Sequence, residues 1–107
     1  MISEADIIRF FKRSDPNVVL GPGDDSALIR PKNGMEIAVS TDMLVADQHF
    51  FSETDPFKLG HKALAVNLSD MAAMGANPRW TTMALALPES LVKANSKWIE
   101  EFARGFF

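Results

Sequence analysis

Four aspartates stand where an acidic side chain is hard to accommodate without a partner. Asp24 and Asp25 lie in the glycine-rich turn GPGDDS. Asp42 ends the apolar run IAVSTD, and Asp70 lies within the segment AVNLSDMAAMG. Buried carboxylates are rare unless they are paired, and few basic residues surround these four. Because a divalent cation such as Mg²⁺ prefers oxygen ligands, the pattern indicates metal-assisted chemistry on phosphates.

The turn at residues 21–26 has two interpretations. Its glycines allow a tight backbone, so one aspartate can bond to local amides while the other points outward to a metal. An ordinary aspartate-rich turn is the simpler alternative, and this motif alone favours it. The turn is not a Walker loop, because the Gly-Lys-Ser/Thr ending is missing.

The triplet Ser40-Thr41-Asp42 closes a strand that we expect to be buried. Strand ends hold side chains in fixed positions while the following loop leaves room for a ligand. Oxygens of Ser40 and Thr41 beside the Asp42 carboxylate suit a hard cation. A polar strand end that forms a side-chain turn is an equally good explanation.

Asp70 is the sharpest single candidate. A helix over residues 56–74 would be apolar around much of its circumference, so we expect it to be largely buried. A carboxylate there must be paired, protonated or bound to a metal. Lys62 lies two turns away and cannot pair with Asp70 directly. A functional role is therefore favoured over a structural one.

His49 lies in the loop that follows Asp42. A surface or capping histidine is the simpler interpretation, and a donor to a substrate phosphate is the alternative. His61, in the first turns of the long helix, is interpreted as structural.

The elements that position these residues follow from periodicity, caps and turns. Ser3 is an expected helix N-cap, Asp55-Pro56 combines a cap with proline at the first helical position, and Gly75 ends the long helix. The order predicts an α+β (mixed α/β) layer in which helices pack on one face of a four-stranded sheet. The expected elements are helix 3–13, strands 18–20, 27–29 and 36–41, helix 56–74, strand 80–87 and helix 96–107.

Composition narrows the class of protein. The chain has 107 residues, enough for one small core, and its net charge of −3 with no Lys/Arg run argues against a nucleic-acid partner. The absence of cysteine excludes disulfides and thiolate metal sites. With neither a signal-peptide pattern nor a bilayer-spanning segment, we expect a cytoplasmic protein with no membrane partner. The aromatic segment SKWIEEFARGFF stops in mid-pattern, so we expect a longer parent protein.

Three motifs together resemble the thiamine-monophosphate kinase family. They are GPGDDSAL at residues 21–28, STDMLV with a following HF within residues 40–50, and KALAVNLSDMAAMGA at residues 62–76. The similarity continues through residues 80–88. Their order and spacing are far more specific than one Gly-Asp-Asp would be.

The resemblance implies that residues 1–107 are the N-terminal metal- and substrate-binding domain of such a kinase. The family belongs to an ATP-binding superfamily with aminoimidazole-ribonucleotide synthetase and selenophosphate synthetase. Its members use ATP and Mg²⁺ to convert thiamine monophosphate to thiamine diphosphate, as homodimers whose N-terminal sheets join. The positions that match its metal ligands are Asp25, Ser40, Thr41, Asp42 and Asp70, with Asp24 a weaker candidate, and His49 matches a substrate contact.

The resemblance also implies that the family's Gly-Gly-Asp segment and C-terminal domain lie outside these 107 residues, in the longer parent protein that we expect. Direct in-line transfer is the expected mechanism, with no covalent nucleophile, because an acceptor phosphate oxygen is already anionic. Two alternatives stay open. One is a related enzyme with another phosphate or carboxylate acceptor, and the other is a metal-binding or dimerisation module without chemistry of its own.

Overall fold

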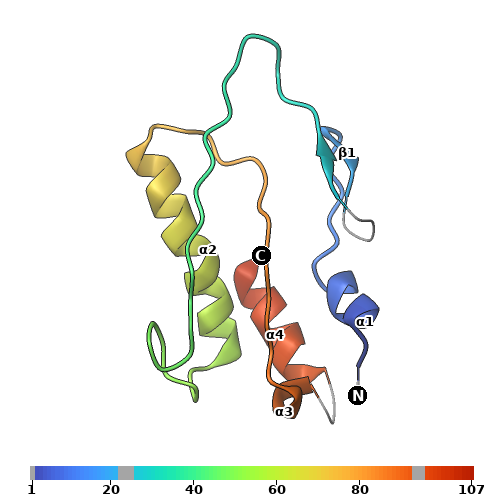
Figure 1. Ribbon diagram of the computed structural model, residues 1–107, viewed down its shortest axis with the longest axis vertical. Coiled ribbons are helices and arrows are strands. Elements are labelled where there is room, and N and C mark those ends of the chain that lie inside the picture. Colours follow the sequence, from blue (N-terminus) through green and yellow to red (C-terminus); the bar gives the residue numbers. More distant parts are fainter. Residues whose placement is uncertain (1, 22–25, 93–95) are drawn as a thin grey trace.

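A computed structural model describes residues 2–21, 26–92 and 96–107 of the chain (Figure 1). Both helices and strands are present, as an α+β chain requires. In sequence order the elements are α1 (Glu4–Arg9), β1 (Val18–Leu20), β2 (Leu28–Ile29), α2 (Pro56–Ala73), α3 (Glu89–Val92) and α4 (Lys97–Phe106).

The long helix α2 confirms the prediction from its caps. The Asp55 carboxylate accepts a hydrogen bond of 3.0 Å from the backbone N–H of Lys58, and Pro56 occupies the first turn. At the other end Gly75 has a φ of +64°, the left-handed conformation that glycine adopts at low cost. Local sequence therefore determines where α2 begins and ends.

The first helix is shorter than predicted. Ser3 forms the expected cap, a capping box with Asp6, but α1 ends at Arg9 rather than continuing to residue 13. The last helix matches its predicted range more closely, and α3 was not predicted.

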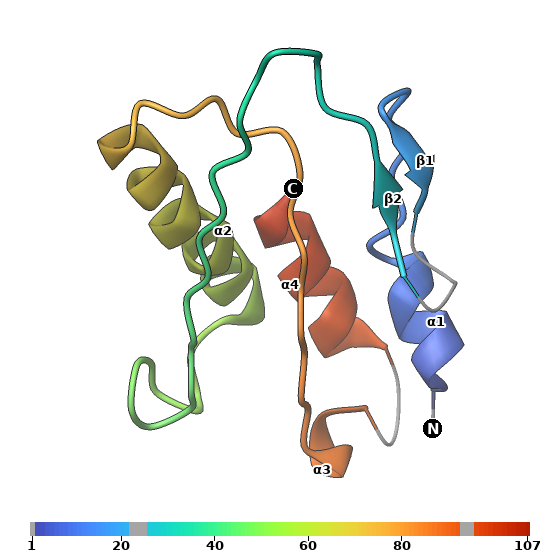
Figure 2. The same ribbon diagram turned by 45° about the horizontal axis from the view of Figure 1, so that its top comes forward.

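The core lies between α2 and α4. Its buried side chains are Leu59 of α2 and Ile99, Phe102 and Phe106 of α4. Within the aromatic C-terminal segment, Phe102 and Phe106 are buried, whereas Trp98 is half-buried and Phe107 is 55% exposed. Phe11, which follows α1, also packs against this core, with its ring centroid 6.2 Å from that of Phe102. Figures 1 and 2 accordingly show α4 between α2 and α1.

The two long helices approach each other at two glycines. A methyl group at Gly60 of α2 would overlap the carbonyl oxygen of Phe102, and one at Gly105 of α4 would overlap the carbonyl oxygen of Phe57. Both glycines are buried. Backbone therefore packs directly on backbone at this crossing.

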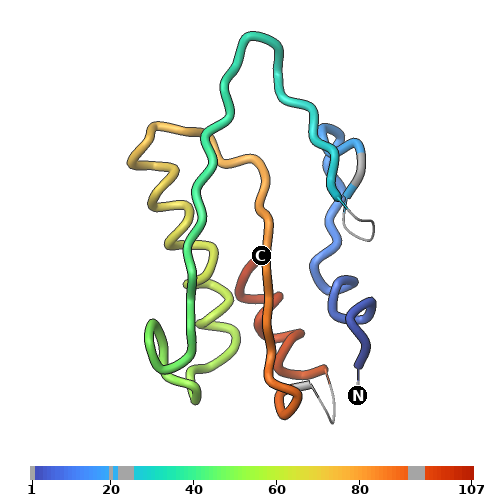
Figure 3. The backbone as a smooth tube through the Cα atoms, viewed as in Figure 1, coloured from blue at the N-terminus to red at the C-terminus, as the bar shows by residue number. Residues whose placement is uncertain are grey.

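The prediction of a four-stranded sheet was wrong. In the described residues, β1 and β2 form one antiparallel pair, and residues 36–41 and 80–87 contain no strand. Figure 3 shows the chain between β2 and α2 as a long arch. Val39 in this arch is 82% exposed. The apolar run was interpreted as a buried strand, but such a run shows only that a surface needs covering, not what covers it.

The open arch gives the chain an extended shape. Its radius of gyration is 15.1 Å, against roughly 13 Å for a compact domain of about 100 residues. No described helix combines the length and apolar character needed to cross a bilayer.

We expect Gly60→Ala and Gly105→Ala each to lower the free energy of unfolding by about 2 kcal/mol or more, since the added methyl must push the two helices apart. Chemical denaturation followed by circular dichroism measures the change. Ser69→Ala, an exposed position on α2, serves as the control and should change stability by less than about 0.5 kcal/mol. Equal stability of all three variants would contradict the close crossing.

Candidate functional site

Two of the predicted carboxylates meet at the surface. Asp42 comes from the arch and Asp70 from the second half of α2, and their side chains share a hydrogen bond. The Ser40 hydroxyl donates a second hydrogen bond, of 3.3 Å, to Asp70 Oδ2. Three oxygen-bearing side chains from two separate segments therefore converge.

The contact changes the acidity of Asp42. Its hydrogen bond with Asp70 raises the pKa of Asp42 above the ordinary value, and desolvation and the negative charge of Asp70 act in the same direction. The charge of His49 acts in the opposite direction and lowers this pKa. A neighbouring negative charge disfavours ionisation of a carboxyl, which is why Asp70 acts in this direction on Asp42. A bound cation would remove the same repulsion.

The expected burial of Asp70 was wrong. Asp70 is exposed, and the buried residues of α2 are Leu59 and Gly60, near its N-terminal end. The reason is that α4 covers α2 along one side and leaves the rest of its circumference open. The two acids are therefore constrained by each other's charge rather than by a buried environment.

The other predicted metal ligands are not part of this contact between Asp42, Asp70 and Ser40. Thr41 is exposed between Ser40 and Asp42, while Asp24 and Asp25 lie outside the described residues. Within the ranges 2–21, 26–92 and 96–107, no group of three or more histidine, cysteine, aspartate or glutamate side chains is arranged to hold a metal ion. The oxygen set that the structure offers is thus two carboxylates and one hydroxyl.

His49 lies in a loop with its own hydrogen bonds. The ring Nδ1 accepts a hydrogen bond of 2.9 Å from the backbone N–H of Val45. In a neutral imidazole the proton is then on Nε2, which can donate to a ligand.

The carbonyl oxygen of His49 accepts a 2.8 Å hydrogen bond from Lys62 Nζ on α2. Helical spacing relates Lys62 only to Asp70, and no sequence pattern indicates a bond from Lys62 to a distant backbone carbonyl.

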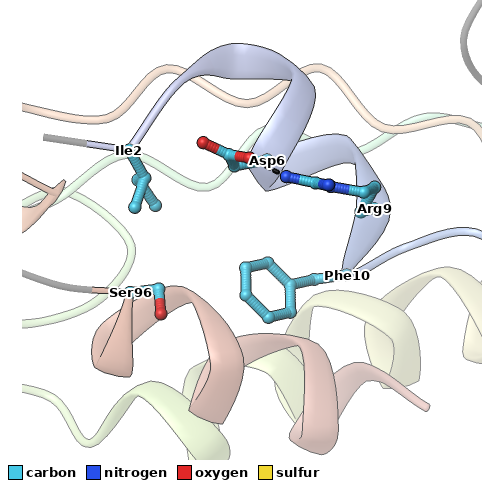
Figure 4. Close-up of a pocket in the computed structure, with 5 residues that line it drawn as sticks. All are labelled: Ile2, Asp6, Arg9, Phe10 and Ser96. Atoms are coloured by element: carbon cyan, nitrogen blue, oxygen red, sulfur yellow. Dashed lines mark ion pairs between the residues drawn. The ribbon is translucent and has the colours of Figure 1, made fainter.

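Two pockets in the described part of the chain lie away from this pair of carboxylates. Figure 4 shows one of about 370 Å³ between α1 and the start of α4, where Asp6 and Arg9 form an exposed ion pair. A second, of about 540 Å³, is lined by Lys12, Arg13, Ser14 and Gly21. Neither Asp42 nor Asp70 lines these two pockets, and both residues are exposed.

We expect Asp70→Asn to bring the pKa of Asp42 back toward its ordinary value, because the substitution removes the carboxylate whose hydrogen bond and negative charge raise it. A ¹³C NMR titration of the Asp42 carboxyl measures this shift. The folded chain keeps the proton at pH values where the unfolded chain has lost it, so stability falls as the pH rises from the ordinary aspartate range to the raised pKa. Asp70→Asn should remove that dependence. An unchanged Asp42 titration would contradict this influence of Asp70 on Asp42.

Comparison with known proteins gives a consistent set of similarities. The family described as "AIR synthase related protein, N-terminal domain" matches residues 23–107. Thiamine-monophosphate kinase of Buchnera aphidicola subsp. Acyrthosiphon pisum is 50% identical over 105 residues, which cover 94% of this chain and 31% of that protein. The kinase of Escherichia coli K12 is 48% identical over 104 residues, with the same two shares. The kinase of Bacillus subtilis is 42% identical over 93 residues, covering 82% of this chain and 29% of its own. The chain thus spans less than a third of the length of these relatives.

Proposed function

Because the chain belongs to the AIR synthase related proteins, as their N-terminal domain, we propose that it is the metal- and substrate-binding part of a thiamine-monophosphate kinase. The parent protein would transfer the terminal phosphoryl group of ATP to thiamine monophosphate, giving thiamine diphosphate. Relatives named for this activity share about half of the aligned residues. A cytoplasmic location stays a prediction.

The observation that carries the proposal is the contact between Asp42 and Asp70, with Ser40 beside them. Mg²⁺ is usually held by one or two carboxylates together with substrate phosphates, and two carboxylates and a hydroxyl on an open surface fit that pattern. We assign these three residues as metal ligands, with Thr41 and Asp25 added from the family resemblance. When bound, Mg²⁺ would neutralise negative charge on the phosphates of both reactants.

The remaining roles belong to the chain's own side chains. Both carboxylates would have to be ionised to act as ligands, so protons would compete with the cation for Asp42 as the pH falls. His49 would donate a hydrogen bond from Nε2 to the phosphate of thiamine monophosphate, and the support is that its Nδ1 already accepts from Val45. No covalent nucleophile is needed, since the acceptor phosphate is itself anionic, and transfer is direct and in line.

We expect Asp42→Ala and Asp70→Ala to lower kcat by about 100-fold or more in the protein at its full natural length, because each removes a ligand for the charge-neutralising metal. Steady-state assays with ATP, Mg²⁺ and thiamine monophosphate measure the loss. The matched control is Glu53→Ala, an exposed acid in the same arch but outside residues 36–41, which should keep wild-type turnover. Near-normal kcat in both aspartate variants would reject the assignment.

Two further assays separate the alternatives. Faster turnover of another phosphate or carboxylate acceptor than of thiamine monophosphate would identify a related enzyme of the superfamily. If the parent protein forms no product with any acceptor but still binds Mg²⁺, it is a binding module. Product formation by the 107-residue chain alone would refute the hypothesis that it is a binding module without chemistry of its own.

We also propose a homodimer in which residues 36–41 of two copies contribute to a shared sheet. The support is the apolar arch, in which Val39 and Met43 are 82% and 74% exposed. Unpaired extended backbone with apolar side chains readily pairs with a second chain.

We expect Val39→Lys to raise the dissociation constant of this dimer by about tenfold or more, since a charge would be buried in an apolar contact. Sedimentation velocity over a range of concentrations measures the constant. Asn33→Lys adds the same charge at an exposed turn of the arch and should leave the constant unchanged. Wild-type protein that sediments as a monomer at all concentrations would rule out the homodimer.

A further inference from the structure

The loop from Val45 to Ser52 is organised by its own hydrogen bonds. Val45 donates its backbone N–H to His49 Nδ1 and accepts the backbone N–H of His49 through its carbonyl, each at 2.9 Å. Asp47 makes the tight turn with a φ of +65°, and its carboxylate accepts the backbone N–H of Ser52 at 3.3 Å. The imidazole is therefore fixed relative to its own loop. These bonds do not fix the loop relative to the carboxylates.

Lys62 makes a hydrogen bond that fixes the loop relative to the carboxylates. Its ammonium donates a 2.8 Å hydrogen bond to the carbonyl oxygen of His49. Lys62 and Asp70 are on the same helix, eight residues or about 12 Å apart along its axis. One rigid element therefore carries both Asp70 and the side chain that holds the His49 loop. Phe50, the next residue, packs against the core and gives the loop a second attachment.

We infer that Lys62 is a positioning residue that fixes His49 relative to the Asp42–Asp70 pair. The substrate part of this inference rests on the proposed function, in which His49 contacts the phosphate of thiamine monophosphate. Lys62 acts through the backbone of His49, so removing its ammonium lets the imidazole move away from the phosphate. That contact exists in both the bound substrate and the transition state, and its loss therefore raises KM more than it lowers kcat.

The test uses the protein at its full natural length and a double-mutant cycle. We expect Lys62→Met to raise KM for thiamine monophosphate about tenfold, as the loss of a charge-assisted hydrogen bond implies, with kcat changed by less than about twofold. His49→Gln should raise KM similarly. Adding Lys62→Met to His49→Gln should cause no further increase, because both remove the same contact.

Two more variants serve as controls for the double-mutant cycle. Lys62→Arg keeps a donor that reaches the carbonyl, so its KM should stay within about threefold of wild type. Lys58→Met removes the same charge one turn earlier on α2 and should match the wild type. Multiplicative KM effects of Lys62→Met and His49→Gln would overturn the inference, because Lys62 would then contact the substrate independently of His49.

A second measurement requires no activity. Hydrogen–deuterium exchange of a peptide covering residues 45–50 should accelerate in Lys62→Met and stay unchanged in Lys58→Met. If wild-type protein phosphorylates no thiamine monophosphate, the proposed function fails. The exchange rates still test whether Lys62 positions the loop. Identical exchange in both variants would overturn the positioning role even in an active enzyme.

Discussion

The backbone contact between α2 and α4 is the constraint on which the other features depend. Gly60 and Gly105 let the two helices approach until each meets a carbonyl oxygen of the other. This approach brings Leu59, Ile99 and Phe102 together as the core. Since α2 carries both Asp70 and Lys62, its placement by α4 also determines where the candidate site lies. A chain of 107 residues has little other core to fix that helix.

The candidate site is organised by electrostatics rather than by enclosure. Asp42 and Asp70 are both exposed, yet the contact between them raises the pKa of Asp42. A cation bound between the two carboxylates would offset the repulsion that raises this pKa. An open surface also leaves room for phosphates, which Mg²⁺ requires as additional ligands. Exposure is thus compatible with the proposed chemistry, although it differs from the buried site that the sequence indicated.

Most of the helical structure could be predicted because its signals are local. Ser3, Asp55-Pro56 and Gly75 are caps whose hydrogen bonds and backbone angles involve only neighbouring residues, and α2 begins and ends where they predict. The strands at residues 36–41 and 80–87 were not found, because pairing depends on a partner that an apolar run does not specify. The same limit explains why the predicted burial of Asp70 was wrong. Its helix has apolar residues around its circumference, but only one side meets α4.

The sequence by itself determined the family, the motifs and the caps, since each of these depends on residue type and spacing along the chain. It also identified Asp42, Asp70 and His49 as candidates. Tertiary structure alone decided that Asp42 meets Asp70, that both are exposed, and that Lys62 holds the His49 loop. The physical reason is that these contacts join residues far apart in sequence, and their geometry follows from how α2 packs and where the arch returns to it.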